Sequence, residues 1–165
     1  MSHIKGNVWK FGDAIDTDII IPARYLVLPL DEMKYKAMEP VAPEFAGKAK
    51  EGDIIVAGRN FGCGSSREQA PAVLRGLGIE AIVAISFARI FFRNAINLGM
   101  PVIECEEIYG HANEGDELEL NPKTGMIRLP EKDLEFQGSK IPDFLLDIIN
   151  DGGLIPHLTA SMKNA

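Results

Sequence analysis

The feature that most constrains the fold is an alternation of strand-like and helix-like runs between residues 53 and 105. The strand-like runs are short and apolar, as buried strands are, and they are residues 53–57, 81–85 and 101–105. The helix-like runs between them begin near Ala70 and Phe87 and end at Gly78 and Gly99, which are typical helix stops. This order predicts a parallel sheet with right-handed crossovers.

The rest of the chain predicts smaller elements around that core. Residues 8–11 alternate and predict a first strand, whereas residues 19–21 predict a buried strand or strand end. The proline-broken segment 25–50 leaves room for a short helix near residues 32–38. Further expected elements are strands at 117–120, 126–129 and 134–136, a hairpin loop at 121–125 and a helix at 142–149. The expected fold class is therefore α/β, one domain over residues 1–165, with a parallel βαβαβ core and additional antiparallel strands.

Charge and cysteine content narrow the class of partner. The chain of 165 residues has a net charge of −7 and no basic run, which argues against nucleic acid and anionic membranes. No run approaches the roughly 18 apolar residues that span a bilayer. The two cysteines, Cys63 and Cys105, are too few for a disulfide framework and too far apart in sequence for a zinc or iron–sulfur motif. We expect no metal on this chain and a reducing, cytoplasmic setting.

Residues 60–69 (NFGCGSSREQ) carry the polar groups best suited to chemistry, because they lie between a predicted strand and a predicted helix. Open α/β sheets place their ligands at such turns. Gly62 and Gly64 let the backbone approach a bound group, and free N–H groups there can hold an anion. Arg67 offers a planar fork that matches a carboxylate, and Ser65 and Ser66 offer hydroxyls for proton transfer. The pattern favours a small, carboxylate-bearing ligand.

Three other interpretations of this motif remain open from the residues alone. Ser65 with Glu68, or Ser66 with Gln69, fits a helix-capping box. A serine hydrolase is weakly supported, because the Gly-x-Ser-x-Gly pattern and a clear His–acid pair are missing. Arg67 could instead form only a surface ion pair.

Four stretches of the sequence resemble the swivelling domain of the aconitase superfamily. They are residues 13–26 (DAIDTDIIIPARYL), 61–68 (FGCGSSRE), 86–95 (SFARIFFRNA) and 151–158 (DGGLIPHL). In the isopropylmalate isomerase branch of that superfamily, this domain is a separate small subunit. The resemblance implies a swivelling β/β/α fold and a hydro-lyase that isomerises 2- and 3-isopropylmalate by dehydration and rehydration in leucine biosynthesis. The alternatives are a homoaconitase-type small subunit and, in another class, a non-catalytic anion-binding regulatory module.

The same resemblance assigns roles to individual residues. It makes Ser65 the catalytic base, and Ser66 and Arg67 the ligands of substrate carboxylates. It also makes the loop formed by Tyr25, Leu26, Val27 and Leu28 the part that contacts the variable group of a small dicarboxylate. Homoaconitase-type small subunits carry arginine at the position of Val27, so an apolar loop here suits an isopropyl group. The alternative is that this loop only packs on the domain or on a partner.

The resemblance also implies a second protein chain. The superfamily holds a [4Fe-4S] cluster with three thiolates, and this chain has only two distant cysteines. We therefore expect no cofactor on this chain and a cluster on a large subunit that supplies the other half of the active site.

Overall fold

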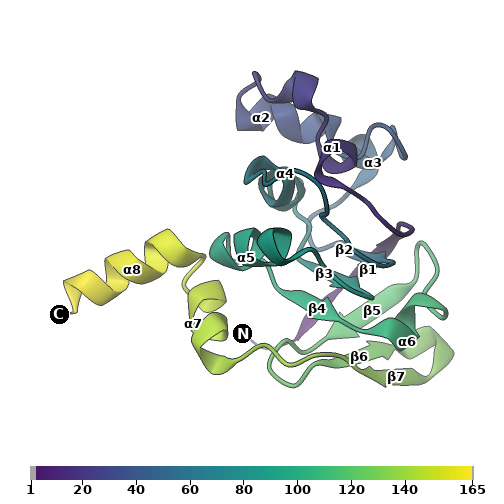
Figure 1. The fold of residues 1–165 in the computed structure, drawn as a ribbon. Coiled ribbons are helices and arrows are strands. Elements are labelled where there is room, and N and C mark those ends of the chain that lie inside the picture. Colours follow the sequence, from purple (N-terminus) through teal and green to yellow (C-terminus); the bar gives the residue numbers. More distant parts are fainter. Residues whose placement is uncertain (1–2, 165) are drawn as a thin grey trace.

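The computed structural model describes residues 3–164, which form a mixed seven-stranded sheet with the strand order β4-β3-β2-β1-β5-β6-β7. The strands are β1 (Ile4–Lys10), β2 (Ile54–Ala57), β3 (Ala81–Ala84), β4 (Val102–Glu104), β5 (Glu117–Leu120), β6 (Met126–Leu129) and β7 (Leu134–Gln137). Strand β1 divides the sheet, because it pairs in parallel with β2 and antiparallel with β5 (Figure 1). The predicted parallel core and the antiparallel addition are both confirmed.

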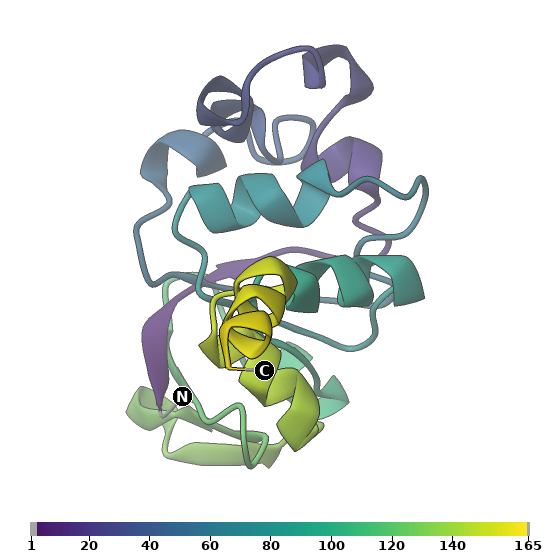
Figure 2. The ribbon, with the colours of Figure 1, turned by 90° about the vertical axis from the view of Figure 1, so that its left-hand side faces the viewer.

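Two crossover helices cover one face of the parallel half. They are α4 (Gln69–Gly76) and α5 (Arg89–Asn97), which lie side by side in both ribbon views (Figures 1 and 2). The C-terminal helices are α7 (Asp143–Asn150) and α8 (Leu154–Lys163). The short elements are α1 (Thr17–Ile20), η1 (Ala23–Tyr25), α2 (Leu30–Met33), η2 (Lys34–Lys36), α3 (Phe45–Lys48), α6 (Glu106–Tyr109) and η3 (Pro130–Lys132). Within residues 3–164, no helix is long and apolar enough to cross a membrane.

The sequence pattern explains where the core lies. Strands β2 and β3 are buried at every position, as their unbroken apolar runs require, whereas β5 and β6 alternate between more and less buried positions. Pro71 is tolerated in α4 because it is the third residue of the helix, where no intrahelical partner for an N–H exists. The glycine stop is confirmed at Gly78, which has a φ of +93°.

Three local expectations were wrong or incomplete. Residues 19–21 do not form a strand, because the Asp16 Oδ1 accepts a hydrogen bond from the Ile19 N–H at 2.8 Å and caps the helical turn α1. Helix α5 begins at Arg89 rather than near Phe87, and Ala88 is its N-cap residue. The sequence pattern predicts no helix after residue 149, whereas the structure has α8 at Leu154–Lys163.

Candidate functional site

The serine-rich motif lies at the carboxyl end of β2, in the connection to α4. Its first part runs beside the connection that follows β3, since Phe61 forms a parallel bridge with Phe87. Gly62 passes very close to α5, because a Cβ built at this position would lie 2.2 Å from the Phe91 Cγ. The Gly62 N–H donates to the carbonyl oxygen of Ile15 at 2.8 Å. Gly62 therefore serves the close approach of the chain, and its N–H group is already bonded within the fold.

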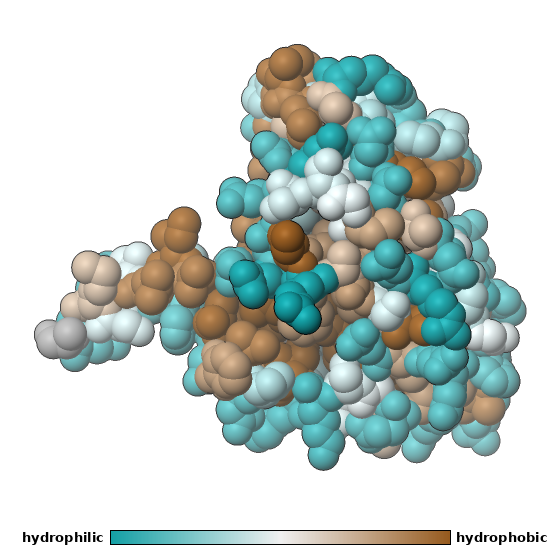
Figure 3. All heavy atoms as spheres, viewed as in Figure 1, coloured by the Kyte–Doolittle hydropathy of each residue, from teal (hydrophilic) through white to brown (hydrophobic). Residues whose placement is uncertain are grey.

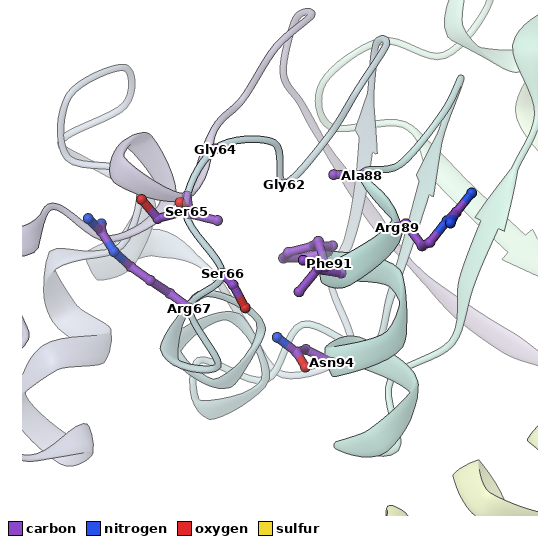
Figure 4. Close-up of a pocket in the computed structure, with 11 residues that line it drawn as sticks. Gly62, Gly64, Ser65, Ser66, Arg67, Ala88, Arg89, Phe91 and Asn94 are labelled. Atoms are coloured by element: carbon purple, nitrogen blue, oxygen red, sulfur yellow. The ribbon is translucent and has the colours of Figure 1, made fainter.

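A surface hollow of about 200 Å³ separates this motif from the start of α5 (Figure 4). Its lining includes Gly64, Ser65, Ser66, Arg67, Ala88, Phe91 and Asn94. Figure 4 shows the Ser66 and Asn94 side chains pointing toward one another across the hollow, whereas Arg89 points away. Ser65 and Ser66 are exposed, and neither hydroxyl has a hydrogen-bond partner among residues 3–164. The capping interpretation is therefore not supported, and the helix begins after Glu68 instead.

Two sets of backbone N–H groups border the hollow. The N–H groups of residues 64–67 make no hydrogen bond to any described residue, and those of residues 89–91 make none either, since they open helix α5. Both segments line the same hollow. Free N–H groups and a helix N-terminus both favour a negatively charged ligand. The sequence pattern predicts this role for both Gly62 and Gly64. The Gly62 N–H is not free, because it is bonded to Ile15, and the pattern does not point to residues 88–91 or Asn94. The signal was available, because neighbouring parallel strands end at the same edge of a sheet.

Arg67 is held at the side of the hollow by an ion pair. Its Nη1 donates to the Asp18 Oδ1 and to the carbonyl oxygen of Ile21, both at 3.1 Å. The guanidinium points away from Phe91 (Figure 4). Hydrogen bonds from the Ala23 N–H and from Arg67 lower the pKa of Asp18, so this carboxylate is charged at neutral pH. The Arg67 side chain is 17% exposed and the Asp18 side chain is 64% exposed, so the guanidinium is held within the fold while its partner carboxylate faces solvent.

Comparisons with known proteins show the family of this chain. The aconitase C-terminal domain family matches residues 30–107. The chain is 53% identical to the isopropylmalate/citramalate isomerase small subunit of Methanocaldococcus jannaschii, covering 99% of this chain and 98% of that protein. It is 48% identical to the 3-isopropylmalate dehydratase small subunit of Halothermothrix orenii, covering 98% and 99%. The chain belongs to the isopropylmalate dehydratase small-subunit family.

Two further relatives show the breadth of this small-subunit family. The methanogen homoaconitase small subunit of Methanothermobacter thermautotrophicus is 52% identical, over 93% of this chain and 89% of that protein. A crystal structure of 3-isopropylmalate dehydratase from Methanocaldococcus jannaschii superposes with a TM-score of 0.91 and 40% identity, covering 97% of this chain and 95% of that one. The predicted fold class and family are therefore confirmed.

The loop of residues 25–28 starts close to the serine motif of this small-subunit protein. Arg67 bonds the carbonyl oxygen of Ile21, and Asp18 also accepts the Ala23 N–H, so both partners lie just before the loop. Tyr25, Leu26 and Leu28 are half-buried against the core, and the Tyr25 hydroxyl donates to Glu39. Val27 differs from these neighbours because it is 89% exposed. Its side chain is thus available to a ligand or a partner.

The cysteines of this small-subunit chain do not fit an iron–sulfur cluster. Cys63 is half-buried and Cys105 is buried, and burial raises the pKa of both thiols. The thiolate is the form that binds a metal, and a raised pKa makes the thiolate less populated at neutral pH. Among residues 3–164, no three His, Cys, Asp or Glu side chains are grouped so that they could hold a metal ion. The three thiolates that such a cluster needs are therefore not available on the described chain.

Proposed function

We propose that this protein is the small subunit of a 3-isopropylmalate dehydratase, a hydro-lyase that interconverts 2- and 3-isopropylmalate by dehydration and rehydration in leucine biosynthesis. The observation that carries this proposal is the hollow where Ser65 and Ser66 meet the free N–H groups of two chain segments. It occurs in a chain about half identical, over nearly its full length, to small subunits of such enzymes. The setting we propose is cytoplasmic.

Ser65 is the proposed catalytic base. In dehydration it would take the proton from the carbon beside a substrate carboxylate, and in rehydration it would return that proton. A serine hydroxyl is a weak base, so its alkoxide requires donors that are already in position. The free N–H groups of residues 64–67 supply such donors, and they need no rearrangement of a side chain. The exposure of Ser65 leaves its hydroxyl accessible to a substrate.

The other groups around the hollow are suited to hold carboxylates. The free N–H groups at the start of α5 are proposed to bind one carboxylate together with Ser66, whose hydroxyl points into the hollow (Figure 4). Arg67 is proposed to bind a second carboxylate from its place beside Asp18. Gly64 has a φ of +94°, a backbone conformation that residues with a side chain rarely adopt, so a glycine allows this loop shape.

A large subunit is the proposed partner. The relatives named as small subunits imply one, and the described residues of this chain offer no cluster of three His, Cys, Asp or Glu side chains that could hold a metal ion. We therefore assign that part of the reaction, and a [4Fe-4S] cluster, to the large subunit. This chain's own contribution is the base, the carboxylate contacts and the loop of residues 25–28.

Isopropylmalate is the proposed substrate because Val27 offers an apolar, exposed side chain to the variable group. A substrate with a third carboxylate would meet no positive charge at this position, and an unpaired buried carboxylate is costly. Homoaconitate remains the second candidate, since one relative at 52% identity is a homoaconitase small subunit.

The test of this function is the Ser65→Ala variant assembled with the large subunit. Turnover of 2-isopropylmalate should fall by roughly two to four orders of magnitude, as expected when a general base is removed. The matched control is Ser66→Ala, which should raise KM more than it lowers kcat. A Ser65→Ala complex that forms normally and keeps near-normal turnover would instead support the non-catalytic, anion-binding module.

A further inference from the structure

Helix α8 carries an apolar stripe that no described part of the chain covers. The stripe consists of Ile155, Leu158 and Met162, whose spacing of three and four residues places them on one face. Their side chains are 77%, 50% and 77% exposed. Figure 1 shows α8 projecting from the body of the molecule, and Figure 3 shows brown, hydrophobic atoms along it.

The helix itself has little support from its own chain. None of the ten residues of α8 is buried, and isolated helices shorter than about 12–15 residues are marginal in water. Only its first turn is anchored. Gly153 packs so tightly on α5 that a Cβ there would lie 2.5 Å from the Asn97 carbonyl oxygen, and His157 Nδ1 pairs with Asp151 Oδ2 at 2.7 Å. A helix fixed at its base, with an uncovered apolar face, is suited to bind another surface.

This stripe continues the surface of the candidate site. A groove of about 220 Å³ lies between α4, α5 and α8 and is lined by Glu68, Asn94, Asn97, Leu98, Leu154 and Ile155. Asn94 also lines the hollow of the site, and Glu68 directly follows Arg67. The surface therefore runs without interruption from the serine motif to the first residue of the stripe.

We propose that the Ile155–Leu158–Met162 stripe docks on the large subunit, within the same interface that closes over the candidate site. This inference rests on the proposed function. A partner that completes the site must cover the hollow, and the neighbouring groove leads it directly onto α8. A second copy of this chain seated on the stripe would stand beside the hollow and compete with the large subunit for that surface. The large subunit is therefore the occupant that the position of α8 favours.

The experiment compares Leu158→Asp with Ala160→Asp. Both residues are exposed, both changes add one negative charge, and they lie on nearly opposite faces of α8 because the helix turns about 100° per residue. The affinity for the large subunit is measured by titration calorimetry, and turnover of 2-isopropylmalate is measured at saturating concentrations of this chain. Leu158→Asp should lower the affinity at least about ten-fold, Ala160→Asp should change it less than about two-fold, and turnover of the saturated complex should be retained in both.

Three outcomes would overturn the proposal. The first is equal affinity of Leu158→Asp and the control. The second is loss of self-association of this chain in Leu158→Asp with unchanged affinity for the large subunit, which would give the stripe to a second copy. The third is failure of the wild-type chain to bind or activate the large subunit, which would remove the proposed function and the docking together. Circular dichroism verifies the fold of each variant, and Met162→Asp, farther along the stripe, repeats the test should Leu158→Asp not fold.

Discussion

Asp18 joins two parts of the candidate site that lie far apart in the sequence. Its Oδ1 accepts hydrogen bonds from the Arg67 Nη1 and from the Ala23 N–H, both at 3.1 Å. Arg67 belongs to the serine motif, whereas Ala23 opens the 3₁₀ turn that leads into the loop of residues 25–28. The Asp18 side chain therefore fixes both the position of Arg67, which is proposed to bind a substrate carboxylate, and the start of the loop of residues 25–28.

Asp18→Asn should weaken substrate binding without removing the base. Asparagine retains an oxygen that can accept the Ala23 N–H, but it loses the charge that holds Arg67. We expect KM for 2-isopropylmalate to rise several-fold in the assembled complex, with a smaller change in kcat. Steady-state kinetics measure both constants, and an unchanged KM would show that the ion pair does not position Arg67 for the substrate.

The same substitution has a signature in the pH dependence of stability. The pKa of Asp18 is lowered in the folded chain, so its contribution to stability is present above the ordinary aspartate pKa of about 4 and is lost as the pH falls below that value. The urea midpoint of the wild type should therefore exceed that of Asp18→Asn at pH 7, and the difference should shrink as the pH falls below the ordinary aspartate pKa of about 4. A difference independent of pH would assign the effect to packing.

Val27→Arg should shift the substrate preference of the complex. The side chain is 89% exposed, so the exchange sacrifices no packing in the isolated chain. A charged hydrogen bond between the new guanidinium and a third carboxylate stabilises the bound acid by about 1.5–3 kcal/mol. The ratio of the two kcat/KM values should therefore shift roughly 10- to 100-fold in favour of homoaconitate-type acids over isopropylmalate. Val41→Arg, at another exposed valine, is the matched control. An unchanged ratio of the two kcat/KM values would place the loop away from the substrate.

At the scale of elements, the contact between the motif loop and α5 shapes the hollow. The loop passes α5 at Gly62, which has a φ of +82°, and the Phe61 ring packs edge-on against Phe91 with centroids 5.2 Å apart. Gly62→Ala places a methyl group against the Phe91 ring in a backbone conformation that alanine rarely adopts. We expect a loss of roughly 1–3 kcal/mol in the free energy of unfolding.

Urea unfolding measures this loss, and Gly47→Ala is its control. Gly47 lies in α3, and a Cβ at this position would have no neighbouring atom within 4 Å, so this alanine should be neutral or slightly stabilising. Equal stability of the two variants would mean that the loop does not depend on its close approach to α5.

Some elements of the fold are predictable from the sequence pattern and others are not. The parallel strands and the hairpin are predictable, because unbroken apolar runs and strict alternation are strong signals. The three isoleucines at residues 19–21 are not, because so short a run has no period and the Asp16 cap decides its conformation. Helix α8 is missed for a different reason, since Gly152 and Gly153 are typical of a helix end and Pro156 lies in the first turn of the new helix.

At the scale of the whole molecule, parallel topology assembles the candidate site. The motif after β2 and the start of α5 after β3 meet because the two strands are neighbours in the sheet. The motif can be found from its own residues, whereas Asn94 and the start of α5 are found only when the predicted strands are placed side by side in the sheet. The proposed remaining part of the active site belongs to the large subunit, which no local pattern in this chain describes.

The isolated chain should remain colourless after anaerobic reconstitution with iron and sulfide. It has two cysteines, Cys63 and Cys105, and both thiols have raised pKa values that disfavour the thiolate. The measurement is the visible absorbance and iron content after desalting, with the separately reconstituted large subunit as the positive control. A stoichiometric cluster on this chain alone would contradict the proposal that the large subunit carries the iron–sulfur cluster.

The most direct test of the central claim is a mixing assay with 2-isopropylmalate. This chain, the reconstituted large subunit and an equimolar mixture of the two are each followed by the absorbance of the unsaturated diacid. We expect turnover by the mixture and none by either chain alone. Turnover by this chain alone, by the large subunit alone, or by no combination of the two would contradict the proposed function.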